Sequence, residues 1–109
     1  MKVKDLIDEL ELEVIAGPDL DREVDGVYCG DLLSNVMANA KKDNLWLTVQ
    51  GHQNTAAVAL LADISAVIIV EGFDFDEAAV KKACQKGINL LKSRETAYEI
   101  SCKLCERNL

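Results

Sequence analysis

The sequence of 109 residues has little of what a catalytic site needs. It contains one histidine, one proline and six glycines, and the glycines never cluster. Neither Gly-x-x-x-x-Gly-Lys-Ser/Thr nor Gly-x-Gly-x-x-Gly occurs, so the glycine-rich loops that bring backbone N–H groups to phosphates are missing. No nucleophile can be paired with a base. These absences argue against a self-sufficient kinase or a dinucleotide oxidoreductase, and we expect no enzymatic activity.

Basic residues and long apolar runs are also scarce. Twelve Lys and Arg against nineteen Asp and Glu give a net charge of −7, with no basic patch for nucleic acid. The apolar runs around 56–62 and 66–70 are separated by Asp63 and are too short to span a membrane. The first ten residues carry acids through their apolar stretch, unlike a signal peptide. We therefore expect a cytoplasmic protein with reduced cysteines and neither membrane nor nucleic-acid partners.

What the sequence does contain is an alternation of two hydrophobic periods. Residues 3–10 have the spacing of a short helix, and from residue 12 onward strands alternate with helices. This order predicts a single α/β domain over residues 1–109, with helices flanking a layered, mainly parallel sheet of about five strands. The predicted strands are 12–16, 23–29, 45–49, 66–70 and 88–91, and the later helices are 31–40, 54–61, 74–87 and 93–107.

Local signals place several helix ends. Asp31 is positioned to cap the second helix, and Asp74 with Glu77 has the spacing of a capping box. Gly87 is positioned to end the helix that follows. The helix beginning at Asn54 or Thr55 is apolar nearly all round, so we expect it to be deeply packed.

The most informative segment is 45–55, Leu-Trp-Leu-Thr-Val-Gln-Gly-His-Gln-Asn-Thr, which reads as a buried strand, a glycine turn and a helix start. In a parallel sheet all strand-to-helix turns lie at one edge, where ligands of open α/β sheets bind. Helix N-termini there offer free N–H groups to anions. The predicted ligand-binding residues are Gly51, His52, Gln53, Asn54, Gly72, Ser93 and Thr96.

His52 has several possible roles. Imidazole can donate a proton, contact phosphate or bind a metal, but it can also stand in a turn without any role. A single histidine without neighbouring carboxylates does not make a metal site, so we expect neither a metal nor a cofactor.

Cys102 and Cys105 have the Cys-x-x-Cys spacing of redox and zinc sites. Redox pairs usually lie at a helix N-terminus, where the dipole lowers the thiol pKa, whereas this pair falls near a helix C-terminus. We therefore favour small apolar core residues, with a thiol or metal role as the alternative.

The order of these pieces resembles the DRTGG domain family, which is similar to the N-terminal, non-catalytic domain of HPr kinase/phosphorylase. The resemblance rests on segments 3–10, 12–17 and 20–26, on the glycine turns at Gly51 and Gly72, and on the polar turn 93–96. Gly51-His52-Gln53 stands where the family commonly has Gly-Asp-Arg. The resemblance implies an accessory regulatory module that forms dimers.

Two functional hypotheses follow. The first is a regulatory homodimer that binds a small anionic ligand, of nucleotide or phosphate type, through the strand-end turns. The alternative is a protein-interaction subunit with no small-molecule site.

Overall fold

Five strands form one sheet in the order β1-β5-β4-β3-β2. The computed structural model describes every residue from Met1 to Leu109. Strands β2 to β5 are parallel, and β1 runs antiparallel to β5 at one edge. The α/β class and the mainly parallel five-stranded sheet are confirmed. The elements are α1 (Val3–Glu9), β1 (Glu13–Ala16), β2 (Val27–Cys29), α2 (Leu33–Asn39), β3 (Leu45–Thr48), α3 (Gln53–Leu61), β4 (Ala66–Ile69), α4 (Glu77–Lys86), β5 (Leu90–Lys92) and α5 (Ala97–Cys105).

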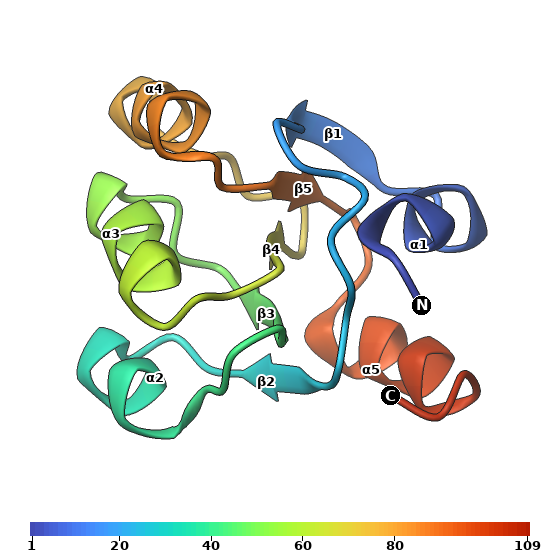
Figure 1. Cartoon of the computed structure of the whole chain (residues 1–109). Coiled ribbons are helices and arrows are strands. Elements are labelled where there is room, and N and C mark those ends of the chain that lie inside the picture. The colour runs from blue at the N-terminus through green and yellow to red at the C-terminus, as the bar shows by residue number, and fades with distance from the viewer.

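The helices cover the two faces of the sheet unequally (Figure 1). Helices α2, α3 and α4 lie on one face, and α1 and α5 lie on the other. Each of the first three connects neighbouring parallel strands, and connections of one hand that step in one direction along a sheet stay on one face. The chain crosses from the α1 face to the other face before α2, and it returns only after β5, when it continues into α5. No helix is long and apolar enough to cross a membrane.

The alternating side chains of β3 and β4 divide the core in two. Leu45, Leu47 and Ile68 pack with α1 and α5, whereas Trp46 and Val67 pack with the helices of the other face. Every residue of both strands is buried. Burial on both faces explains why the β4 sequence is an unbroken apolar run instead of an alternating pattern.

Several predicted boundaries are wrong. The strand predicted over 23–29 covers only Val27–Cys29, and the strand predicted over 88–91 lies at Leu90–Lys92. No helix separates β1 from β2, in agreement with the consecutive predicted strands 12–16 and 23–29, so strands and helices alternate only from β2 onward. Helix α3 buries Ala56 and Ala59 but leaves Leu61 71% exposed, so it is not packed all round.

The predicted caps had mixed outcomes. Gly87 ends α4 in the left-handed conformation, with φ of 76°, as predicted. Leu32, not Asp31, is the N-cap of α2, because the Asp31 carboxylate accepts hydrogen bonds from the Thr48 hydroxyl and the Val49 N–H instead, both at 2.9 Å.

Asp74 and Glu77 do not form a capping box. The N-cap of α4 is Asp76, and Asp74 pairs with Lys92 on the neighbouring strand. The side chain that the local spacing assigned to the helix thus forms an ion pair between the loop before α4 and strand β5.

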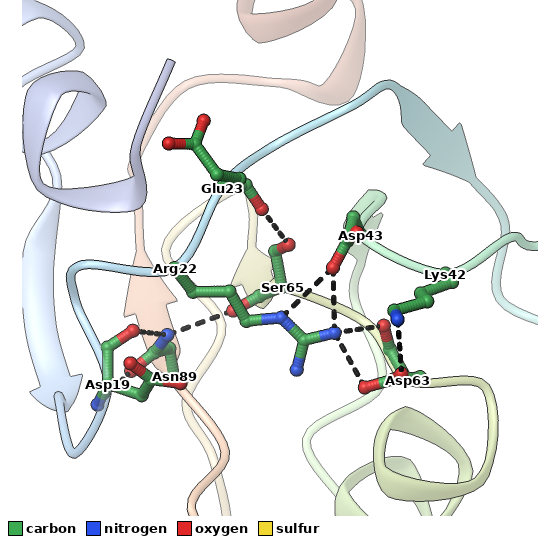
Figure 2. A network of polar contacts seen from close by, with 8 residues as sticks. All are labelled: Asp19, Arg22, Glu23, Lys42, Asp43, Asp63, Ser65 and Asn89. Atoms are coloured by element: carbon green, nitrogen blue, oxygen red, sulfur yellow. Dashed lines mark hydrogen bonds and ion pairs between the residues drawn. The ribbon is translucent and has the colours of Figure 1, made fainter.

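A polar cluster holds the 19–25 segment against the amino ends of the strands (Figure 2). The Arg22 guanidinium donates to the Asp43 carboxylate at 3.0 Å and to the Asp63 carboxylate at 2.6 Å. Burial alone lowers the pKa of Arg22, but the hydrogen bonds that Arg22 donates to Asp63 and Asp43 outweigh it, so that pKa is raised. Both aspartates have positive φ, 65° and 57°, in the turns that lead into β3 and β4. Arg22 therefore ties two helix-to-strand turns together.

Candidate functional site: the edge at the carboxyl ends of β4 and β5

The strand-end turns are not equivalent in this topology. After β4 the chain turns to α4 on one face of the sheet, and after the adjacent β5 it turns to α5 on the other face (Figure 1). Adjacent parallel strands whose connections diverge in this way leave a crevice outside their carboxyl ends, which is where ligands bind in open α/β sheets. The fold therefore singles out the β4–β5 edge.

A hollow of about 350 Å³ lies at this edge. It is lined by Glu71 and Gly72 from the turn after β4, and by Lys92 and Arg94 from the end of β5 and the turn after it. A second hollow, of about 250 Å³, shares Lys92 and Arg94 and extends toward the turn between α1 and β1. Both hollows are thus bordered by the same two cations.

The two turns are fastened to each other at the backbone. The Glu71 N–H donates to the Glu95 carbonyl at 2.9 Å, and the Gly72 N–H donates to the Ser93 carbonyl at 3.0 Å. Glu71 and Gly72 both have positive φ, 59° and 72°. No atom lies within 4 Å of the place where a Gly72 side chain would begin, so this glycine is required by its backbone conformation and leaves the hollow open.

Some charges around the hollow are paired, whereas Glu71 and Arg94, which both line it, form no ion pair. Lys92 forms an ion pair with Asp74, and Glu95 forms one with Lys103 at 2.7 Å. The bond with Glu95 is the main reason that the pKa of Lys103 is raised. Arg94 is exposed and makes neither a hydrogen bond nor an ion pair with any residue of the chain. It is the free cation of this edge.

The turn at Gly51 lies beside this edge but is closed by protein. A methyl group at Gly51 would overlap the Asp74 carbonyl oxygen, and the Gly51 carbonyl accepts the Asp76 N–H at 2.8 Å. The glycine is therefore needed for the approach of segment 74–76. Because Asp74 also pairs with Lys92, this segment connects the Gly51 turn to the hollow.

His52, Gln53 and Asn54 are exposed on the outer side of the same turn. His52 is the N-cap of α3, and its Nδ1 accepts the Asn54 N–H at 3.1 Å. None of the three lines the hollow beside Gly72. The structure thus assigns His52 a local helix-capping contact and leaves Nε2 free to meet a ligand.

Ser93 and Thr96 differ in availability. Ser93 is 6% exposed, and its hydroxyl oxygen accepts the Glu95 N–H at 3.0 Å. Thr96 caps α5 through a capping box with Glu99, in which its hydroxyl oxygen accepts the Glu99 N–H and its own N–H donates to the Glu99 carboxylate. Ser93 borders one of the two hollows, whereas Thr96 is engaged with its own helix.

Sequence reasoning singled out Gly72 and Ser93 but missed Lys92, Arg94 and Glu71. The missing information was the strand order, because only the adjacency of β4 and β5 shows which two turns diverge. Once that order is known, the two basic residues on either side of Ser93, Lys92 and Arg94, identify the site.

The cysteines do not occupy the core, so the expectation of small apolar core residues is wrong. Cys29, Cys84, Cys102 and Cys105 are all free thiols on the surface. No group of three or more His, Cys, Asp or Glu side chains is arranged to hold a metal.

Neither a protein-family model nor a curated protein matches this sequence. The structure, an α/β domain with its crevice at the β4–β5 edge, is similar to a crystal structure of the CBS and DRTGG domains of the regulatory region of Clostridium perfringens pyrophosphatase, complexed with activator, diadenosine tetraphosphate. The TM-score is 0.74 at 10% sequence identity, over 92% of this chain and 44% of that chain. The similarity supports the DRTGG-like fold that the sequence motifs predict.

Proposed function

We propose that this domain is a non-catalytic regulatory module of the DRTGG type. It binds a small anionic ligand, of nucleotide or phosphate type, at the β4–β5 edge and forms a homodimer in the cytoplasm. The observation that carries the proposal is Arg94, an exposed guanidinium without an ion-pair partner at the crevice between diverging connections. Guanidinium groups bind phosphate through two parallel hydrogen bonds.

One further cation at this edge suits the same ligand, whereas the Glu71 carboxylate, which also lines the hollow, opposes it. Lys92 adds a second positive charge to the hollow, although Asp74 pairs with it in the unliganded protein. A phosphate group would compete with Asp74 for Lys92. Because Asp74 belongs to the segment that covers Gly51, binding would also affect the β3–α3 turn, where a ligand that extends beyond the hollow would meet His52 and Gln53.

The structural neighbour gives independent support. It is a regulatory region, not a catalytic one, and its crystal structure contains a nucleotide activator. By analogy, this chain would sense a phosphorylated metabolite and transmit its presence to a partner.

The test is a thermal-shift screen with inorganic phosphate, pyrophosphate, AMP, ADP, ATP and diadenosine tetraphosphate. A ligand at about 100 times its Kd stabilises the folded state by about 2.7 kcal/mol, which is measurable in a small domain. Arg94→Gln should abolish the shift and His52→Ala should weaken it. Lys81→Gln, which removes an exposed cation of α4, should leave the shift unchanged.

The second candidate function is a protein-interaction subunit without a small-molecule site. Large exposed side chains favour it, among them Tyr98 at 78% and Leu32 at 68% exposure. If none of the six compounds raises the melting temperature, the ligand proposal is rejected in favour of this one. A shift that persists in Arg94→Gln would reject the β4–β5 edge as the binding site.

A further inference from the structure

One side of the molecule is built from the edge strand β2 and the two helices that flank it. Figure 1 shows β2 at the edge of the sheet opposite β1, with α2 beside it on one face and α5 on the other. A contact between Cys29 Sγ and Ser101 Oγ, 3.4 Å apart, joins β2 to α5. A bond from the Asn35 amide to the Tyr28 hydroxyl, 2.9 Å long, joins β2 to α2. These three elements form one continuous surface, which we call the β2 side.

The backbone of β2 has an unpaired edge. The Gly26 carbonyl and the Gly30 N–H bond to β3, which occupies the inner edge of the strand. Because backbone groups of a strand alternate in direction, the N–H and C=O groups of Val27 and Cys29 face outward. Such an edge is a template for pairing with another strand unless charge, proline or a covering segment blocks it.

No such block is present on the β2 side. Segment 26–40, which contains β2 and α2, carries one charged residue, Asp31, although 28% of the whole chain is charged. Asp31 is engaged by Thr48 and Val49. The solvent-facing positions of α2 are Ser, Asn, Met and Ala, whereas α4 has Lys and Glu at such positions.

The flanking helices add exposed apolar and uncharged side chains. Leu32 at the start of α2 is 68% exposed and Met37 within it is 45% exposed. On α5, Tyr98, Cys102 and Cys105 follow a spacing of four and three residues, so they share one exposed face next to Ser101. This helix thus has a buried apolar face toward the sheet and a second, uncharged face toward solvent.

We propose that a second copy of this chain docks on the β2 side, with β2 pairing antiparallel to β2 of that copy. This inference rests on the homodimer of the proposed function and names its surface. Charge favours a second copy on this side: two copies that each carry −7 repel one another, but β2 and α2 contain no charged residue, and the two charges of α5, Glu99 and Lys103, have opposite signs. An antiparallel pairing centred on Tyr28 sets Val27 opposite Cys29 of the second copy and makes the contact two-fold symmetric.

The resulting dimer has a ten-stranded sheet and packs α2 against α2, and α5 against α5, across the two-fold axis. Both faces of the new strand pair would then be covered by helices, as a strand pair in a stable interface requires.

The experiment is sedimentation velocity of the purified chain over a range of concentrations. The wild type should be dimeric in the micromolar range. Met37→Glu and Ala38→Glu each place a carboxylate on the exposed face of α2, and each should weaken the dimer at least about tenfold, which is about 1.4 kcal/mol. Cys29→Lys should weaken it as well, because lysine at a strand edge opposes pairing. The matched control is Leu61→Glu, an exposed apolar position at the end of α3, which should leave the dimer intact.

Far-UV circular dichroism of each variant shows that loss of the dimer is not loss of the fold. A wild-type chain that stays monomeric at all concentrations overturns the homodimer and its surface together, while the ligand screen decides the rest of the proposed function separately. A dimer that resists the three β2-side variants, or that dissociates only in Leu61→Glu, overturns the β2 side alone.

Discussion

The side chain of Asn89 and the backbone of Asp19 exchange two hydrogen bonds, although 70 residues separate them. Asn89 Nδ2 donates to the Asp19 carbonyl at 2.7 Å, and Asn89 Oδ1 accepts the Asp19 N–H at 3.0 Å. Nδ2 also donates to the Ser65 carbonyl at 2.9 Å, so the amide joins three segments (Figure 2). Because Asn89 is 1% exposed, water cannot replace these bonds.

Asn89→Ala is therefore expected to destabilise the fold by about 1–3 kcal/mol, since it leaves the buried Ser65 carbonyl and the part-buried backbone groups of Asp19 without partners. Urea denaturation measures this loss as a lower midpoint at an unchanged slope. Asn54→Ala is the matched control, because Asn54 is exposed and its side chain makes no hydrogen bond. Equal midpoints for the two variants would contradict the assigned role of Asn89.

Arg22→Lys tests whether the geometry of the guanidinium or only its charge holds the turns before β3 and β4. Lysine keeps the charge but cannot reach Asp43 and Asp63 with a planar fork, so we expect a loss of about 1–2 kcal/mol, reduced by the partial exposure of both carboxylates. Lys42→Ala should change stability by less than about 0.5 kcal/mol, because Lys42 is exposed and lies 3.9 Å from Asp63. If the Arg22→Lys variant is as stable as the wild type, the positive charge alone is enough to hold the two turns.

Gly51→Ala and Gly87→Ala separate two reasons for a glycine. Gly87 has φ of 76° with free space around it, so alanine there should cost about 1 kcal/mol of backbone strain. Gly51 is limited by the nearby Asp74 carbonyl, so alanine there must displace segment 74–76 and should cost clearly more. Thermal unfolding gives both values. If Gly51→Ala destabilises the fold less than Gly87→Ala does, segment 74–76 does not close the Gly51 turn.

The acid limb of the stability profile should depend on Glu99. Hydrogen bonds from the backbone N–H and then from the hydroxyl of Thr96 hold the pKa of Glu99 below its ordinary value. A carboxylate with a lowered pKa in the folded state stabilises the fold above its ordinary pKa, and this stabilisation is lost as the pH falls through the lowered value. Melting temperatures of Glu99→Gln should therefore fall less between pH 5 and pH 3 than those of the wild type. Glu106→Gln, whose side chain makes no hydrogen bond, is the control and should follow the wild type.

Much of the fold could be predicted because the signals are local. The buried runs at β3 and β4 and the glycine after α4 each depend on neighbouring residues, and all were located correctly. Asp31 and Asp74 were misassigned because each bonds to a residue far along the chain, Thr48 and Lys92, rather than to its own helix. A cap inferred from spacing fails when a tertiary partner binds the same side chain more favourably.

The candidate site depended even more on tertiary information. Gly72 and Ser93 could be predicted from their turns, but Arg94 gains its meaning only from the divergence of the connections after β4 and β5. The spacing of Cys102 and Cys105 likewise places both on one face of a helix but does not show whether that face is buried. An apolar stripe for the core and one for an interface look alike in a sequence.

The antiparallel pairing of β1 with β5 has a consequence for the order in which the protein can fold. Strand β1 is made early, but its sole neighbour in the sheet is the last strand, and Glu13 is paired with Lys92. The chain must lose the entropy of closing this long loop before the pairing can stabilise it, and this slows folding. During synthesis, β1 therefore has no strand partner until β5 has been made, whereas α1 can already bond to residues 20–22.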